Sequence, residues 1–132
     1  MVQEDLIKEA ASTAHKQELD KHTSIGSVGS ALVTDRGNVY KGCNLDCNCG
    51  LGFCAEVGAI SAMISRGETR IRSIVAVRPN GTPISPCGKC RELMYQLSAD
   101  NLEADVILKD KTVKLRALLP ELWDEDRRRA EE

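Results

Sequence analysis

The sequence predicts an α/β fold in which helices pack on a mixed β-sheet. Two β-rich runs, residues 27–34 and 38–42, flank the turn-forming segment 35–37, and this arrangement is typical of a hairpin. After the hairpin, helix-like and strand-like segments alternate, which is typical of helices that connect strands of one sheet. With 132 residues, 42% of them hydrophobic, the chain can bury one core, so we expect residues 1–132 to form a single domain.

The spacing of apolar residues predicts the elements in order. Residues 2 to about 20 carry apolar side chains at helical intervals among charges, which indicates an amphipathic first helix. After the hairpin, helices and strands are predicted to alternate over residues 54–67, 71–77, 87–97 and 104–109. Residues 124–132 are highly charged, and we expect a solvated tail there.

Composition favours a small-molecule substrate. The formal net charge is −2 and aromatic residues make up 3% of the chain, whereas nucleic-acid surfaces are usually basic and carry stacking rings. We therefore expect no nucleic-acid partner. No apolar stretch approaches the ~18 residues of a membrane helix. No leader-like segment precedes the first predicted helix. These observations predict no membrane partner and a cytoplasmic, reducing location.

Groups for a metal ion and a proton shuttle lie in two short motifs, Cys54-Ala-Glu56 and Pro86-Cys87-Gly-Lys-Cys90. A zinc ion held by three protein ligands keeps a fourth position for water and lowers the pKa of that water from ~15.7 to about 7. A nearby glutamate that does not touch the metal can then carry protons. A Cys followed two residues later by Glu, and then P-C-x-x-C, is the signature of zinc deaminases. The motifs predict such an enzyme, with Zn²⁺ as cofactor.

Both motifs lie at predicted helix starts. Cys54 precedes an apolar helical run, and Cys87 and Cys90 lie on one face at the start of the next helix. Two helix N-termini would therefore point at one metal ion. Three thiolates on Zn²⁺ leave a net charge of −1, which opposes ionisation of water. The positive helix ends and the neighbouring Arg91 could offset that charge.

Other uses of the six cysteines stay open at this point. Disulfides are one alternative, although no signal peptide is visible and the spacing is typical of a metal site. The stronger alternative is a closed structural zinc site formed by Cys47, Cys49, Cys87 and Cys90. It would leave Cys54 a buried bystander and Glu56 without a role. Cys43, together with Cys47 and Cys49, either lines the site or packs as a small reduced core residue.

Two further segments support a family resemblance. Residues 28–44 resemble a V-G-A-A-L hairpin that leads to a G-x-N turn, and residues 118–123 resemble an L-L-P sequence followed by an aromatic. With the two motifs, they resemble the small homotetrameric cytidine deaminases and the related blasticidin-S deaminases. The resemblance implies a three-layer sandwich with helices on both faces of a mixed sheet of about five strands.

The resemblance also implies a reaction and a set of site residues. The reaction is hydrolytic deamination of a cytosine-type ring to a uracil-type ring, within a homotetramer whose subunits share active sites. The implied metal ligands are Cys54, Cys87 and Cys90, with Glu56 as the proton shuttle. The implied substrate contacts are Asn44, Asp46, Ala55, Ser85 and Trp123.

Some of these assignments have structural alternatives. Asn44 and Asp46 stand where the family's N-x-E contacts a ribose, yet both residue types are also ordinary turn formers. Trp123 stands at the C-terminal aromatic that completes a neighbouring subunit's pocket, and its alternative is an intrachain core position. His15, on the polar side of the first predicted helix, and His22, in a loop, receive no catalytic role.

The chain departs from the family pattern at three positions. Asp46 is one methylene shorter than the family's glutamate, and Gly26 stands where the family has an aromatic. Val57 replaces the arginine that commonly follows the catalytic glutamate, so Arg91 is expected to tune the charge instead.

Three functions therefore remain open for the chain. The first is deamination of cytidine or deoxycytidine, and the second is deamination of a blasticidin-S-type nucleoside antibiotic. A non-catalytic, zinc-stabilised binding module is the third, although it would have no need of Glu56.

Overall fold

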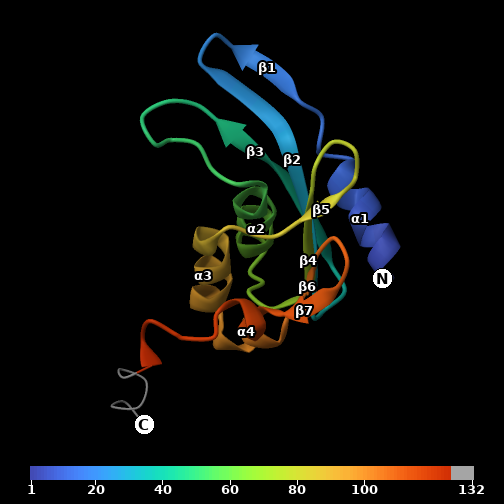
Figure 1. Ribbon diagram of the computed structural model, residues 1–132, viewed down its shortest axis with the longest axis vertical. Coiled ribbons are helices and arrows are strands. Elements are labelled where there is room, and N and C mark those ends of the chain that lie inside the picture. Colours follow the sequence, from blue (N-terminus) through green and yellow to red (C-terminus); the bar gives the residue numbers. More distant parts are fainter. Residues whose placement is uncertain (126–132) are drawn as a thin grey trace.

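The computed structural model describes residues 1–125 and shows a mixed seven-stranded sheet with helices on both faces (Figure 1). The strands are β1 (Gln17–Asp20), β2 (Thr23–Thr34), β3 (Val39–Asp46), β4 (Ile71–Val77), β5 (Pro83–Ile84), β6 (Asp105–Ile107) and β7 (Thr112–Lys114). The helices are α1 (Gln3–Ala11), α2 (Ala55–Ser65), α3 (Gly88–Leu97), the 3₁₀ helix η1 (Ala99–Glu103) and α4 (Leu115–Leu118). Most of the predicted charged tail, residues 126–132, lies outside the described residues.

β2 is the central strand of the sheet. It pairs antiparallel with β1, β3 and β4, while β4 pairs in parallel with β6 and β6 pairs antiparallel with β7. The short β5 pairs antiparallel with the end of β4. The predicted mixed sheet with helices on both faces is confirmed. The strand count exceeds the expected five because β1 and β5 add short pairings at the ends of longer strands.

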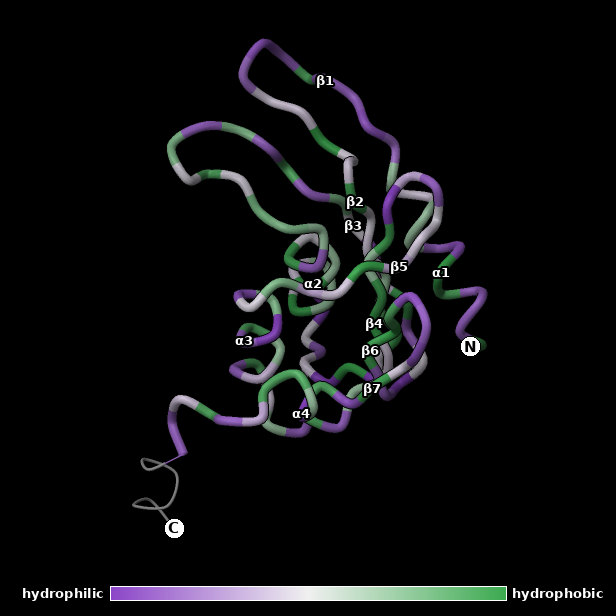
Figure 2. The backbone as a smooth tube through the Cα atoms, viewed as in Figure 1, coloured by the Kyte–Doolittle hydropathy of each residue, from purple (hydrophilic) through white to green (hydrophobic). Residues whose placement is uncertain are grey.

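Alternating side chains of the strands enter two cores, as the two-residue period of a strand requires. The core on the face covered by α2 and α3 includes Leu32, Ile74 and Val106. The core on the opposite face includes Ala31, Val75, Ile107 and, from α1, Leu6. In Figure 2 the inner strands β4 and β6 are mainly hydrophobic and the edge strand β1 is mainly hydrophilic. Among residues 1–125, no helix has both the length and the apolar character needed to cross a membrane.

The first helix is shorter than predicted, because α1 ends at Ala11 and not near residue 20. The Ser12 and Thr13 hydroxyls bind carbonyl oxygens of the preceding turn, at 2.6 and 2.8 Å, and such local bonds compete with helix continuation. Residues 17–20 instead form β1, where Leu19 is 57% exposed. His15 lies between α1 and β1 and not on a helix.

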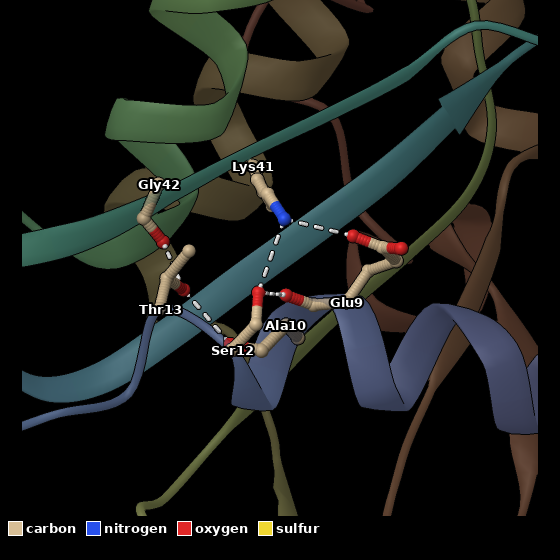
Figure 3. Close-up of polar contacts among 6 residues, drawn as sticks. All are labelled: Glu9, Ala10, Ser12, Thr13, Lys41 and Gly42. Atoms are coloured by element: carbon tan, nitrogen blue, oxygen red, sulfur yellow. Dashed lines mark hydrogen bonds and ion pairs between the residues drawn. The ribbon is translucent and has the colours of Figure 1, made fainter.

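The end of α1 is fastened to β3, as Figure 3 shows. Lys41 Nζ of β3 lies 2.9 Å from Glu9 Oε2 and 3.2 Å from Ser12 Oγ. The Thr13 hydroxyl lies 3.0 Å from the Gly42 carbonyl oxygen. An exposed ion pair of this kind contributes at most about 1 kcal/mol, so these contacts mainly fix where the chain leaves the helix.

Two glycines bring α2 unusually close to β3. A Cβ atom on Gly42 would lie 2.7 Å from the Gly58 carbonyl carbon, and one on Gly58 would lie 3.1 Å from the Cys43 carbonyl oxygen. Side chains at these positions would push the helix off the strand, because ordinary carbon contacts are about 3.5–4.0 Å. The glycine pair therefore sets the depth at which the N-terminus of α2 sits beside the end of β3.

Candidate active site

A cavity of about 510 Å³ lies where β3 ends and α2 and α3 begin. Its walls combine residues from β2, β3, the segment before α2 and the segment before α3. The residues that matter most for chemistry are Asn44, Asp46, Cys54, Glu56, Ser85 and Cys87. The two sequence motifs therefore meet at one cavity, as predicted.

The cysteines of the two motifs meet at the start of two helices. Cys54 is the N-cap residue of α2, Cys87 is the N-cap residue of α3, and the buried Cys90 lies in the first turn of α3. Their sulfur atoms all lie within 4.8 Å of one another, with 3.4 Å between the Cys54 and Cys87 sulfurs. The prediction that two helix N-termini converge on these thiols is confirmed.

This arrangement fits a tetrahedral zinc ion. Zn–S bonds of about 2.3 Å place tetrahedral sulfur ligands about 3.8 Å apart, which agrees with the observed cluster. Within residues 1–125, neither Cys47 nor Cys49 joins a group of potential metal ligands. All six cysteines are free thiols. The cluster therefore favours a three-thiol site that includes Cys54 over a closed site of four cysteines or a disulfide framework.

The pKa values of the three thiols are shifted in different directions by their surroundings. Burial raises the pKa of the Cys54 thiol and, more strongly, that of Cys90. Burial also acts on Cys87, but it is outweighed by hydrogen bonds from the Cys90 backbone N–H group, the Cys54 and Cys90 thiols and the Lys89 backbone N–H group, which together lower the pKa of the Cys87 thiol. Cys87 is thus the thiol that ionises most easily, and a cation bound to the cluster would displace protons from the others.

Glu56 is a buried carboxyl beside the thiol cluster. It lies in the first turn of α2, is 5% exposed and lines the cavity. Burial raises the pKa of this carboxyl, an effect that its own backbone N–H group partly opposes. A carboxyl with a raised pKa exchanges protons closer to neutral pH, as a general acid–base group must.

The substrate contacts predicted from the sequence fall into two groups. Asn44, Asp46, Ala55 and Ser85 line the cavity with Glu56, and their predicted substrate contacts stay predictions. Trp123 is not among the lining residues and is 59% exposed, so it is not a core residue of the described chain.

Arg91 contacts the segment that precedes Cys87. Its guanidinium donates to the Pro86 carbonyl at 2.9 Å, to the Ser85 hydroxyl at 3.0 Å and to the Leu118 carbonyl at 3.4 Å. These bonds brace the chain between β5 and α3, next to a cavity wall. The predicted charge-tuning role of Arg91 stays a prediction.

The sequence analysis missed an aromatic wall of the cavity. Phe53, the one phenylalanine of the chain, lines the cavity and pairs with Leu45 through two backbone hydrogen bonds of 3.0 Å. Its position directly before Cys54 was the available signal. Gly26, where the family aromatic was expected, has φ +83°, and a Cβ there would lie 1.9 Å from the His15 carbonyl oxygen. A side chain at position 26 would meet the backbone before β1.

A comparison with known protein families shows which family the chain belongs to. Residues 1–104 match the family described as the cytidine and deoxycytidylate deaminase zinc-binding region. The chain belongs to this family. It is therefore a hydrolytic deaminase that acts on C–N bonds, which sets aside the alternative of a non-catalytic module.

Individual relatives of this deaminase agree with the family match. The cytidine deaminase of Mycobacterium tuberculosis is 32% identical over 101 residues, which cover 76% of this chain and 74% of the relative. The blasticidin-S deaminase of Bacillus cereus is 33% identical over 82 residues, covering 55% of this chain and 59% of the relative. The crystal structure of cytidine deaminase from Mycobacterium leprae superposes with a TM-score of 0.76 at 28% identity, covering 92% of this chain and 100% of that one.

Proposed function

We propose that this deaminase converts the cytosine base of a free nucleoside, cytidine or deoxycytidine, to the uracil form with release of ammonia, using zinc. The observation that carries the proposal is the cluster of three cysteine sulfurs within 4.8 Å of one another, two of which, Cys54 and Cys87, line one cavity with the buried Glu56. A thiol cluster alone would suit a structural metal. The adjoining buried carboxyl of Glu56 and the cavity indicate a catalytic site and not a structural one.

Each residue of the cluster has a distinct role in this proposal. Cys54, Cys87 and Cys90 would hold zinc as thiolates, and the two helix N-termini would offset their negative charge. Zinc bound there supplies Lewis acidity that makes water a nucleophile at neutral pH. Glu56 would take one proton from a water molecule and pass it to the ring nitrogen, and would then carry the second proton, from the new hydroxyl on the ring carbon, to the leaving amine. The ring carbon thereby gains oxygen and loses ammonia.

The walls of the cavity support a free nucleoside as substrate. Phe53 presents an aromatic side chain for contact with a planar base, and Asp46, held by the Asn44 amide at 3.0 Å, gives the wall a polar group suited to a sugar. Ser85 and Ala55 complete the wall near the metal ligands. The similarity to curated cytidine deaminases over most of their length favours cytidine or deoxycytidine.

A blasticidin-S-type substrate is the second candidate. It is supported by Val57, which stands where cytidine deaminases commonly carry arginine and where the blasticidin-S enzymes lack it. The blasticidin-S deaminase of Bacillus cereus is also among the relatives, although it aligns over a shorter part of the chain than the Mycobacterium tuberculosis enzyme does.

We also propose a cytoplasmic homotetramer. Trp123 is 59% exposed and lies away from the lining of its own cavity, which suits a side chain that reaches a neighbouring subunit. Leu51, at 71% exposure, lies in the loop between β3 and α2 and would also gain burial in a contact between subunits. Six free thiols suit a reducing compartment.

A substrate panel tests the proposal. Zinc-loaded protein is mixed with cytidine, deoxycytidine, cytosine and blasticidin S, and both the loss of the cytosine ultraviolet absorbance and ammonia release are followed. Faster turnover of cytidine or deoxycytidine than of the other two supports the proposal. Turnover of blasticidin S alone would move the second candidate ahead, and turnover of none would refute both.

A further inference from the structure

An irregularity in β2 turns Ser27 toward the cavity. The β2–β3 pairing shifts between Ile25 and Gly29, so that three residues of β2 face Asn44 alone in β3. Bulges of this kind re-aim side chains and are common beside active sites. The bulge is pinned from the α1 side, where Gly26 packs against the backbone of His15. Ser27 and Val28 consequently line the cavity.

Asn44 fills this bulge with its own side chain. Its Oδ1 accepts a hydrogen bond from the Val28 N–H at 3.0 Å, and its Nδ2 donates to Ser27 Oγ at 2.8 Å and to Asp46 Oδ2 at 3.0 Å. A side-chain amide has two N–H donors, so both are used within the chain. Asn44 is 7% exposed and has no N–H left for a ligand.

Ser27 and Asp46 keep free capacity where Asn44 does not. The Ser27 hydroxyl donates to Asp46 Oδ2 over 3.5 Å, longer than the usual 2.5–3.0 Å of an O–H···O bond, so this contact is weak and a ligand can take the proton instead. Among residues 1–125, no hydrogen bond reaches Asp46 Oδ1. The two side chains therefore offer one donor and one acceptor next to each other on the cavity wall.

We infer that Ser27 is a substrate-contacting specificity residue that, with Asp46, binds one hydroxyl group of the substrate, and that Asn44 positions both. A hydroxyl both donates and accepts, which matches this pair. The inference rests on the proposed function, since it assumes a substrate that carries hydroxyls beside its base. It assigns to Ser27 a contact that the sequence analysis gave to Asn44.

Ser27→Ala is assayed with cytidine and with its 2′-, 3′- and 5′-deoxy analogues. Loss of one hydrogen bond should lower kcat/KM for cytidine about 3- to 10-fold, mainly through KM. For the one analogue that lacks the contacted hydroxyl, the same substitution should change kcat/KM less than about twofold. Ser27→Cys, which keeps the size but donates weakly, should behave like Ser27→Ala.

Ser30→Ala is the matched control, because Ser30 lies in the same strand but is buried and donates to the Val75 carbonyl at 2.8 Å. It should lower the melting temperature and leave the ratios between substrates unchanged. Equal loss on all four substrates for Ser27→Ala, or no loss on any, would overturn the inference while the proposed function stands. If the zinc-loaded parent releases ammonia from none of the four, the proposed nucleoside function fails, and the inference falls with it.

Discussion

Gly42→Ala should weaken the fold and the active site together, because Gly42 lies where β3 touches α2. The added Cβ would lie 2.7 Å from the Gly58 carbonyl carbon and 2.8 Å from the Ala59 nitrogen. Carbon contacts of about 3.5–4.0 Å are normal, so the helix must move by about 1 Å. Overpacking of this kind lowers the free energy of unfolding by about 1–3 kcal/mol, measurable by urea denaturation of the zinc-loaded protein.

This displacement of α2 would also move active-site residues, because Cys54 is the N-cap residue of α2 and Glu56 lies in its first turn. A misplacement of about 1 Å at reacting groups can lower turnover by ~100-fold. We therefore expect Gly42→Ala to lose about 10- to 100-fold in kcat on the best substrate of the panel, with zinc content measured on the same sample.

Two other glycines give a graded control. A Cβ on Gly58 would lie 3.1 Å from the Cys43 carbonyl oxygen, so Gly58→Ala should do less damage than Gly42→Ala. A Cβ on Gly88 would meet no atom within 4 Å, so Gly88→Ala should keep both stability and turnover. Parent-like behaviour of Gly42→Ala, or equal damage from Gly88→Ala, would refute this account of the helix–strand contact.

Three further predictions concern the metal, the assembly and acid stability. Cys47→Ser and Cys49→Ser should leave about one zinc per chain, and loss of zinc in either would revive the closed four-cysteine site. Trp123→Ala should raise KM several-fold and reduce the tetramer fraction in light scattering, with zinc retained. If the KM and the mass of the assembly were both unchanged, Trp123 would not belong to an active site shared between subunits. The Tyr40 hydroxyl, 2.7 Å from Glu68, lowers the pKa of that carboxyl. The ionised Glu68 therefore stabilises the fold above the ordinary glutamate pKa, and this stabilisation is lost as the pH falls. The difference in melting temperature between the parent and Glu68→Gln should therefore shrink in acid. A difference that stays constant with pH would contradict a stabilising role for the ionised Glu68.

The reactive centre could be predicted from the sequence because its geometry is mostly local. Cys54 and Glu56 lie on one helix start and Cys87 and Cys90 on another, so helical geometry places each pair. The placement of both starts at one cavity followed from the α/β order, since open α/β sheets bind ligands at strand ends.

The rest of the site depends on contacts that no local pattern specifies. The length of the first helix depended on how the hydroxyls of Ser12 and Thr13 are used, and apolar periodicity does not report that. The orientation of Ser27 depends on the bulge that His15 pins through Gly26. Such contacts join segments far apart in the sequence, so they appear only once the chain is folded.

Turnover by zinc-loaded Glu56→Gln tests the central claim most directly. The variant keeps a side chain of similar size but cannot carry a proton, so it should retain about one zinc per chain and lose at least ~100-fold in kcat. Glu68→Gln is the matched control, because Glu68 is equally buried at 5% exposure yet lies outside the cavity lining, and it should keep parent-like kcat. Near-parent turnover by zinc-loaded Glu56→Gln would contradict the assignment of Glu56 as the proton carrier.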